Sequence, residues 1–354
     1  MGLRGGAAFV RLAAAMLTLE RLQRIHLHER PAGQIVVAKI LGLNYRMPPR
    51  TEIVVEGAEV LRGLPSVFFA MNHTDRYNYW PFQYEFYRTY NRFTATWVKG
   101  KYYEKPATAT FLDWCNNIPM PSRGYVVTTE YRRVLGALPG EGDYRLLRDL
   151  VDHRREPDDA LVAEVSADAR RFMHVFAGRD GAGGPEDASL AREVLVRFDE
   201  VFDAMTREVL RINREAVTER NLCVLVFPEG TRSHRLGKGH SGLVQVAQAL
   251  GTPIVPIGCS GSDKVYPTNN PFAKGGRVVY RIGRPLAWDG PELSPHRVRA
   301  AYLPLSRQAG LDHGEAFAAA TQVVMNAINE LVDPEYRMSD DPEAGVKKGV
   351  RRFV

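Results

Sequence analysis

The chain has 354 residues, of which 45% are hydrophobic and 25% are charged. This composition is ordinary for a globular protein that buries a core, in one large domain or two, and it sets a disordered chain aside. The formal net charge of +6 favours an anionic partner, either nucleic acid or the anionic surface of a membrane.

Three cysteines, Cys115, Cys223 and Cys259, lack the spacing of a metal site. Their apolar neighbours indicate reduced, buried thiols, so we expect a protein that faces the cytosol.

Residues 1–50 predict an amphipathic region of two helices. Residues 7–29 place apolar side chains at helical spacing on one face and basic side chains on the other. Neither this stretch nor the apolar run 35–43 has the ~20 uninterrupted apolar residues of a membrane span, and no signal-peptide pattern is present. The pair either lies in a membrane interface or packs on the rest of the protein.

From residue 51 onward, apolar runs and amphipathic stretches alternate. The runs predict strands at 52–57, 66–71, 92–98, 222–227, 252–258 and 278–282, and the amphipathic stretches predict helices at 79–90, 243–250 and 316–332. Short buried strands joined by helices indicate an α/β fold with a mixed, mostly parallel sheet flanked by helices.

A helical insertion interrupts this pattern at about residues 125–220. Helices are expected at 145–155, 160–177 and 189–220, with a flexible loop at 178–187. A lid, a partner surface and inert decoration all remain open for it. The expected domains are therefore the amphipathic region 1–50, an α/β domain 51–290 that contains the insertion, and a C-terminal helix and basic tail within 291–354.

Two polar motifs follow two of the predicted strands. The first begins Asn72-His73 and ends at Asn78, and the second runs from Pro228 to Ser233. Because loops after parallel strands share one edge of the sheet, we expect His73 to face Arg232. A histidine with a pKa of about 6.5 suits a general base at neutral pH. An arginine fork suits the recognition of phosphate.

These motifs carry a resemblance. Asn72-His73, followed much later by Phe227-Pro228-Glu229-Gly230-Thr231-Arg232-Ser233 and Val255-Pro256-Ile257, resembles the glycerophospholipid acyltransferase family, in particular the bacterial lysophosphatidate acyltransferases. The resemblance covers roughly residues 50–290, apart from the insertion. It implies transfer of a fatty acyl group from an acyl thioester, acyl-CoA or acyl-ACP, to a lysophospholipid such as 1-acylglycerol-3-phosphate.

The resemblance also implies partners and roles. No cofactor, metal or nucleic acid is expected, and the protein would act at an anionic membrane surface, as a peripheral or monotopic protein on the cytoplasmic face. His73 would be the general base. Contacts to the substrate are implied for Lys99, Arg123, Glu229, Gly230, Thr231 and Arg232. For Lys99, a solvated charge pair with Lys101 is the alternative.

One position departs from the family. The family pattern is His-x-x-x-x-Asp, whereas this chain has Asn78 at the last place and an aspartate at Asp75. In the serine-protease triad, converting the aspartate that orients the histidine to asparagine lowers turnover by about 10⁴. We therefore hypothesise that Asp75 supplies the missing carboxylate to His73. The alternative function is a catalytically impaired relative that binds lipid.

Overall fold

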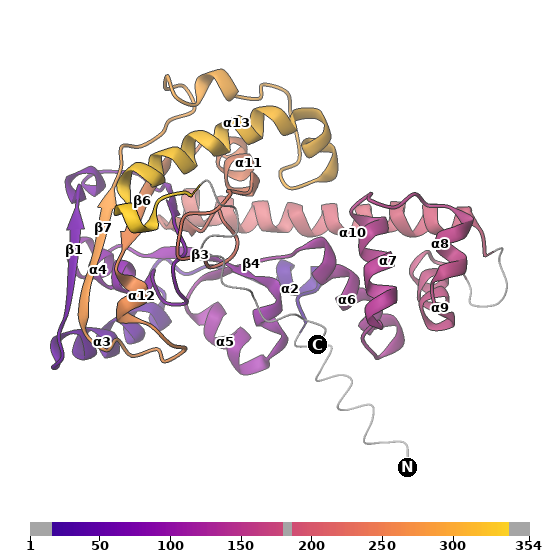
Figure 1. Cartoon of the computed structure of the whole chain (residues 1–354), viewed down its shortest axis with the longest axis horizontal. Coiled ribbons are helices and arrows are strands. Elements are labelled where there is room, and N and C mark those ends of the chain that lie inside the picture. Colours follow the sequence, from indigo (N-terminus) through magenta and orange to yellow (C-terminus); the bar gives the residue numbers. More distant parts are fainter. Residues whose placement is uncertain (1–15, 180–185, 340–354) are drawn as a thin grey trace, which may run out of the picture.

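The computed structural model describes residues 16–179 and 186–339, which contain a seven-stranded sheet covered by helices on both faces (Figure 1). The strand order is β1-β7-β6-β2-β5-β3-β4. All neighbours from β6 to β4 pair in parallel, β7 runs antiparallel to β6, and β1 is parallel to β7. The predicted mixed, mostly parallel sheet flanked by helices is confirmed.

The strands are β1 (Thr51–Glu56), β2 (Phe68–Met71), β3 (Thr94–Lys99), β4 (Asn117–Met120), β5 (Cys223–Val226), β6 (Ile254–Ser260) and β7 (Gly276–Ile282). The helices are α2 (Leu19–Gln23), α3 (Ala32–Arg46), α4 (Trp80–Tyr90), α5 (Pro106–Trp114), α6 (Arg123–Leu135), α7 (Glu141–Val151), α8 (Asp159–Glu164), α9 (Ala167–Phe176), α10 (Ala188–Arg214), α11 (Gly242–Ala249), α12 (Ser262–Val265) and α13 (Arg307–Leu331). Short 3₁₀ turns include η1 (Ala58–Leu61) and η2 (Gly100–Glu104). Within the described residues, no helix is both long enough and apolar enough to cross a membrane.

The central strand β2 is buried on both faces of the sheet. Phe68 and Ala70 point into a core shared with α11 and α13, whereas Phe69 and Met71 point into a core shared with α3 and α4. Successive side chains of a strand alternate between faces, so a strand covered on both sides reads as a continuous apolar run. Each buried phenylalanine contributes about 1.5–3 kcal/mol of hydrophobic stabilisation.

The N-terminal region is helical over a shorter stretch than predicted. Residues 7–15 lie outside the described part of the chain, α2 spans only Leu19–Gln23, and residues 24–29 are not helical. The guanidinium of Arg211 donates to the carbonyls of Leu22 and Ile25, so tertiary hydrogen bonds replace the next helical turn. The prediction of a continuous helix is therefore wrong over residues 24–29.

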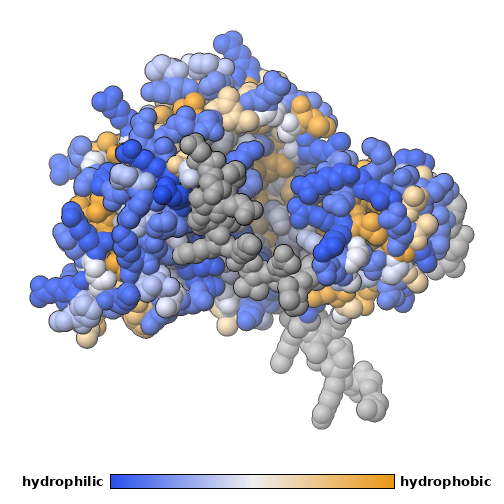
Figure 2. Space-filling view, in the orientation of Figure 1, coloured by the Kyte–Doolittle hydropathy of each residue, from blue (hydrophilic) through white to orange (hydrophobic). Residues whose placement is uncertain are grey.

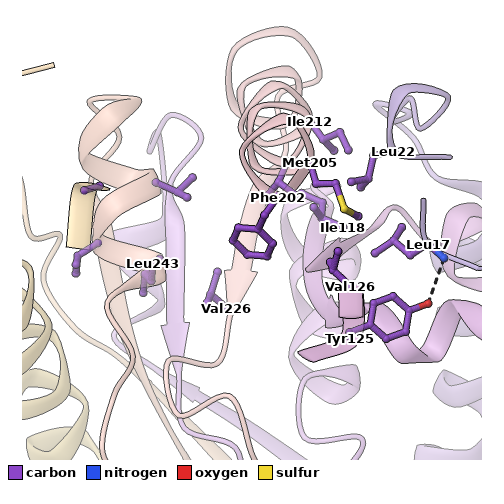
Figure 3. Packing of buried hydrophobic residues seen from close by; sticks show 14 of the residues in the cluster. Leu17, Leu22, Ile118, Tyr125, Val126, Phe202, Met205, Ile212, Val226 and Leu243 are labelled. Carbon is purple, nitrogen blue, oxygen red and sulfur yellow. Dashed lines mark hydrogen bonds between the residues drawn. The ribbon is translucent and has the colours of Figure 1, made fainter. Parts of the chain in front are cut away.

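This segment packs into the protein core (Figure 3). Leu17 and Leu22 are fully buried and lie beside Tyr125 and Ile212, and the amide of Leu17 donates to the Tyr125 hydroxyl at 3.1 Å. The second predicted helix is confirmed as α3, which buries Leu41 on one side. Its outward face exposes an apolar stripe at Val36, Ile40, Leu43 and Met47.

The insertion forms a helical lobe beside the sheet, and α10 runs from the sheet into it (Figure 1). The single helix predicted at 160–177 is divided into α8 and α9. Ser166 is the reason, because its hydroxyl caps α9 through the amide of Ala169 and its own amide donates to Asp143. The visible surface is largely hydrophilic, with apolar side chains gathered on the lobe and in the hollow next to it (Figure 2).

Asn72 fastens β2 to β6 through its side chain. Its amide group donates to the carbonyl of Cys259 at 2.9 Å and accepts from the amide of Cys259 at 2.7 Å.

Since Asn72 is buried, Asn72→Ala leaves two backbone groups without partners. We expect a loss of about 2–4 kcal/mol in the free energy of unfolding, measured by urea denaturation. The exposed Asn326→Ala is the control and should change stability by less than about 0.5 kcal/mol. Equal effects of the two substitutions would contradict this role.

Candidate active site

The two polar motifs meet at one edge of the sheet. Strands β2 and β5 are adjacent and parallel, so the loop that begins at His73 and the turn that contains Arg232 leave the sheet side by side. The backbone joins them, because the amide of Ser233 donates to the carbonyl of His73 at 2.8 Å. The structure thus brings together the two motifs that the sequence places about 150 residues apart.

Glu229 makes the second connection between these loops. Its carboxylate accepts from the amide of His73 at 2.7 Å and from the amide of Gly237 at 2.8 Å. The side chain is buried, and burial raises the pKa of its carboxyl to about 7, although the two amide hydrogen bonds oppose the rise. Glu229 therefore holds the histidine loop against the glycine-rich segment that follows the turn.

The ring of His73 is held on two sides. It stacks on Phe227, with centroids 4.1 Å apart and planes inclined by 17°. Its Nδ1 lies 3.1 Å from Oδ1 of Asn78. The aromatic face and the amide together fix the plane of the imidazole, with His73 itself half-buried at the end of β2.

The orientation of Asn78 determines the tautomer of His73. The amide nitrogen of Asn78 donates to the carbonyl of Asn72 at 2.7 Å, so its oxygen is the atom that faces the ring. An amide oxygen only accepts, which requires the proton of His73 on Nδ1 and leaves Nε2 as the basic nitrogen. Asn78 therefore orients the ring of His73 and brings no charge to it.

Asp75 bonds within its own turn. Its carboxylate accepts from the amide of Tyr77 at 2.8 Å and from the hydroxyl of Thr74 at 3.0 Å. The side chain is buried, and burial raises its pKa. The contact to Nδ1 of His73 comes from Asn78 instead, so the geometry gives no support to the hypothesis that Asp75 orients the ring.

Cations gather beside the histidine. Arg232 is half-buried, and Lys99 ends the neighbouring strand β3. The pKa of Lys99 is lowered by partial burial and then by the positive charges of Lys101 and Arg232. Among the described residues, none of these three cations is paired with a carboxylate. Such a group is suited to an anionic ligand.

The rest of the predicted binding turn shapes the backbone. Gly230 has a positive φ of 64°, and a Cβ there would lie 3.2 Å from the ring of His240. Thr231 is exposed at the tip of the turn. A glycine is therefore required where the chain turns beside His240, while Thr231 is open to a ligand.

Arg123 is engaged by the insertion. It begins α6, and its guanidinium lies 2.5 Å from Asp199 of α10 and donates to the carbonyl of Val151 at 2.9 Å. The same group lies over the rings of Phe198 and Phe202. The side chain predicted to contact phosphate thus joins the lobe to the sheet edge.

An aromatic groove begins next to the histidine. Tyr79 packs edge-on against Phe227 and also lines a groove between α3, α4 and α5. The groove is further lined by Val37, Leu41, Trp80, Tyr84, Tyr87 and Phe111. Tyr79 therefore connects this groove to the aromatic ring on which His73 stacks.

Sequence reasoning missed Phe227 and Tyr79 as parts of this site. Phe227 is the residue that follows β5 and directly precedes Pro228, and this position alone was a usable signal. Nothing in the local sequence marks Tyr79. Within the residues that the structure covers, no cluster of three histidines, cysteines or carboxylates has the geometry of a metal site.

A protein family described as Acyltransferase matches residues 153–260 of the chain. The matched stretch contains the turn at 228–233, and it begins after His73, Lys99 and Arg123. This match supports the resemblance predicted from the motifs over residues 153–260, which are less than a third of the chain.

Comparisons with curated proteins and with solved structures give no further assignment. No curated protein matches the chain. Among solved structures, the crystal structure of the 1-acyl-sn-glycerophosphate (LPA) acyltransferase PlsC from Thermotoga maritima aligns with a TM-score of 0.40 and 15% identity, over 92% of this chain and 88% of that chain. A similarity of this size is too low to transfer a substrate.

Glu229 predicts a pH-dependent stability. Its pKa of about 7 in the folded protein lies above the ordinary value of 4.5, so the folded state holds this proton more tightly than the unfolded chain. The resulting stabilisation is present below about pH 4.5 and is lost as the pH rises towards about 7. We expect the unfolding free energy of the wild type minus that of Glu229→Gln to fall over this range and then level off.

Urea denaturation at several pH values measures this difference. The exposed Glu59→Gln is the matched control and should differ from the wild type by the same amount at every pH. A difference for Glu229→Gln that does not change with pH would show that the buried carboxyl is not the titrating group.

Proposed function

We propose that this protein transfers a fatty acyl group from an acyl thioester, acyl-CoA or acyl-ACP, to the free hydroxyl of a lysophospholipid such as 1-acylglycerol-3-phosphate. The observation that carries the proposal is the geometry of His73. Its Nδ1 is oriented by Asn78, which leaves Nε2 as a base, and unpaired cations lie beside it. The match of residues 153–260 to a family described as Acyltransferase supports acyl transfer as the class of reaction.

The reaction proceeds by proton transfer to His73. Nε2 takes the proton of the acceptor hydroxyl while the hydroxyl oxygen forms a bond to the thioester carbonyl carbon. The tetrahedral intermediate then collapses, the carbon–sulfur bond breaks, and the proton passes from Nε2 to the departing thiolate. The face of Phe227 stabilises the imidazolium that exists between these steps, by about 0.5–2 kcal/mol.

The acceptor is recognised through its phosphate. Arg232 and Lys99 place two positive charges next to the histidine, and a phosphate monoester carries up to two negative charges. A glycerol backbone separates that phosphate from the attacking hydroxyl by only a few bonds. The short spacing suits a base and a cation pair that follow neighbouring strands.

The apolar parts of the substrates arrive from a membrane. The stripe at Val36, Ile40, Leu43 and Met47 leaves large apolar side chains in water, and Trp114 of α5 is also exposed. Such a surface supports peripheral binding to lipid. The aromatic groove between α3, α4 and α5 is lined by the same helix α3, and we infer that it receives part of the acyl chain. The cytoplasmic face is part of the proposal, because the three described cysteines are free and buried.

Substitutions of His73 and Asn78 test the proposed general base. We expect His73→Ala to lower kcat by about 10²–10⁴, because the general base is lost. Asn78→Leu keeps the side-chain volume but removes the acceptor for Nδ1, and we expect a loss of at least about tenfold. Initial rates with a long-chain acyl-CoA and vesicle-bound 1-acylglycerol-3-phosphate measure both. The exposed His28→Ala is the control.

The same assay separates the enzyme from a lipid-binding relative. If the wild type binds the lysophospholipid but transfers no acyl group from acyl-CoA or acyl-ACP, the alternative function is correct. Full activity of His73→Ala would remove the histidine from the mechanism.

Substitutions of Arg232 and Arg123 are expected to change different properties, acceptor binding for Arg232 and stability for Arg123. Arg232→Gln should raise the KM of the acceptor by about 10- to 100-fold, as expected for a lost charged hydrogen bond, and change the KM of the donor little. Arg123→Gln breaks the pair with Asp199 and should lower the free energy of unfolding by about 1–3 kcal/mol. Kinetics and thermal unfolding of both variants distinguish the roles. A large rise in acceptor KM for Arg123→Gln at unchanged stability would restore it as a phosphate ligand.

A further inference from the structure

A second pair of cations lies beside the first. Arg76 belongs to the loop that begins at His73, and Lys101 belongs to η2, directly after β3. The guanidinium carbon of Arg76 is 6.0 Å from the centre of the Tyr102 ring, and the ammonium of Lys101 is 5.8 Å from the same centre. Both cations are exposed. The ring of Tyr102 in η2 thus contacts positive charges from two loops of the site.

The two pairs form one positive region. The charge of Lys101 lowers the pKa of Lys99, and so does the charge of Arg232, which connects the outer pair to the inner pair. Within the described residues, neither Arg76 nor Lys101 is matched by a carboxylate, in contrast to Arg123. Four cations that repel one another are tolerated where an anionic ligand balances them.

A single acceptor phosphate does not use all four charges. Its two negative charges would be matched by the half-buried Arg232 and by Lys99. Arg76 and Lys101 are exposed and follow β2 and β3, of which β2 also precedes His73 and β3 ends in Lys99. This outer pair is therefore available to the phosphate of the other substrate.

We propose that Arg76 and Lys101, with Tyr102 between them, bind the phosphate groups of the acyl donor, a thioester of phosphopantetheine. The inference rests on the proposed function and adds the donor's binding site to it. The chemistry is shared by coenzyme A and by a holo acyl carrier protein, since both present a phosphate at the end of the pantetheine arm. Cations on loops suit such a flexible, solvent-exposed anion.

The kinetic test compares two double variants. Arg76→Ala/Lys101→Ala removes the outer pair, and Arg62→Ala/Arg284→Ala removes two exposed arginines outside the loops that carry the site. With palmitoyl-CoA, we expect the donor KM of the first variant to rise by about tenfold, at an unchanged acceptor KM. With S-palmitoyl-N-acetylcysteamine, which has no phosphate, the difference between the two variants should disappear.

A loss that is equal for both donors, or that appears in the acceptor KM, would overturn the proposal. Arg76→Lys/Lys101→Arg keeps the charges and should restore the donor KM to within about twofold of the wild type. Failure of this variant at normal thermal stability would show that charge is not what the donor recognises.

A binding measurement separates this proposal from the function on which it rests. Calorimetric titration of coenzyme A into the wild type and both double variants needs no turnover, and we expect weaker binding only in Arg76→Ala/Lys101→Ala. The same titration with holo acyl carrier protein identifies which source of phosphopantetheine is preferred. Binding of either molecule without acyl transfer would end the proposed function and keep the subsite. Normal binding of both, with weaker association to anionic vesicles, would assign the pair to the membrane and end the subsite.

Discussion

The site depends on one buried carboxylate. Glu229 accepts hydrogen bonds from the amides of His73 and Gly237, so the loop after β2, the turn after β5 and the glycine-rich segment share one fixed point. Without this carboxylate, no side chain would link the three backbone segments at the sheet edge through hydrogen bonds to their amides. A carboxylate accepts from both amides at once, whereas an amide side chain in its place has only one oxygen to offer. The motif therefore needs a glutamate for geometry, before any chemistry is considered.

The proposed mechanism is compatible with Asn78 because of the way its amide is held. In the serine-protease triad, asparagine fails because its amide allows the wrong tautomer of histidine. Here the amide nitrogen of Asn78 is already bound to the carbonyl of Asn72, so only the oxygen is free to meet the ring. Asn78 lacks the charge of the family's aspartate, and in the proposed mechanism the aromatic face of Phe227 stacked on His73 replaces part of it. Orientation and charge stabilisation, which one aspartate combines, are divided between two residues.

Much of the fold was predictable because its strands are short apolar runs that end in polar motifs. The sequence did not predict that β2 and β5 are neighbours in the sheet. The loops that carry His73 and Arg232 lie together because these two strands pair in parallel. Three features depended on tertiary contacts that no local pattern encodes. Arg211 ends the N-terminal helix by binding its carbonyls, Ser166 divides a predicted helix, and Asp199 holds Arg123. In each case, a side chain distant in sequence or a helix cap produced a structure that differs from the one predicted from the sequence pattern.

The position of Arg123 also gives the insertion a structural meaning. The lobe grows from the edge strand β4, where an open parallel sheet would otherwise leave unpaired backbone groups and a cation facing water. Asp199 and the two phenylalanines of α10 cover that corner and neutralise the arginine. The positive charge that remains at the sheet edge is then concentrated between β2 and β3. In the proposed function, an anionic substrate binds beside the histidine, where Arg232 and Lys99 have no carboxylate partner among the described residues.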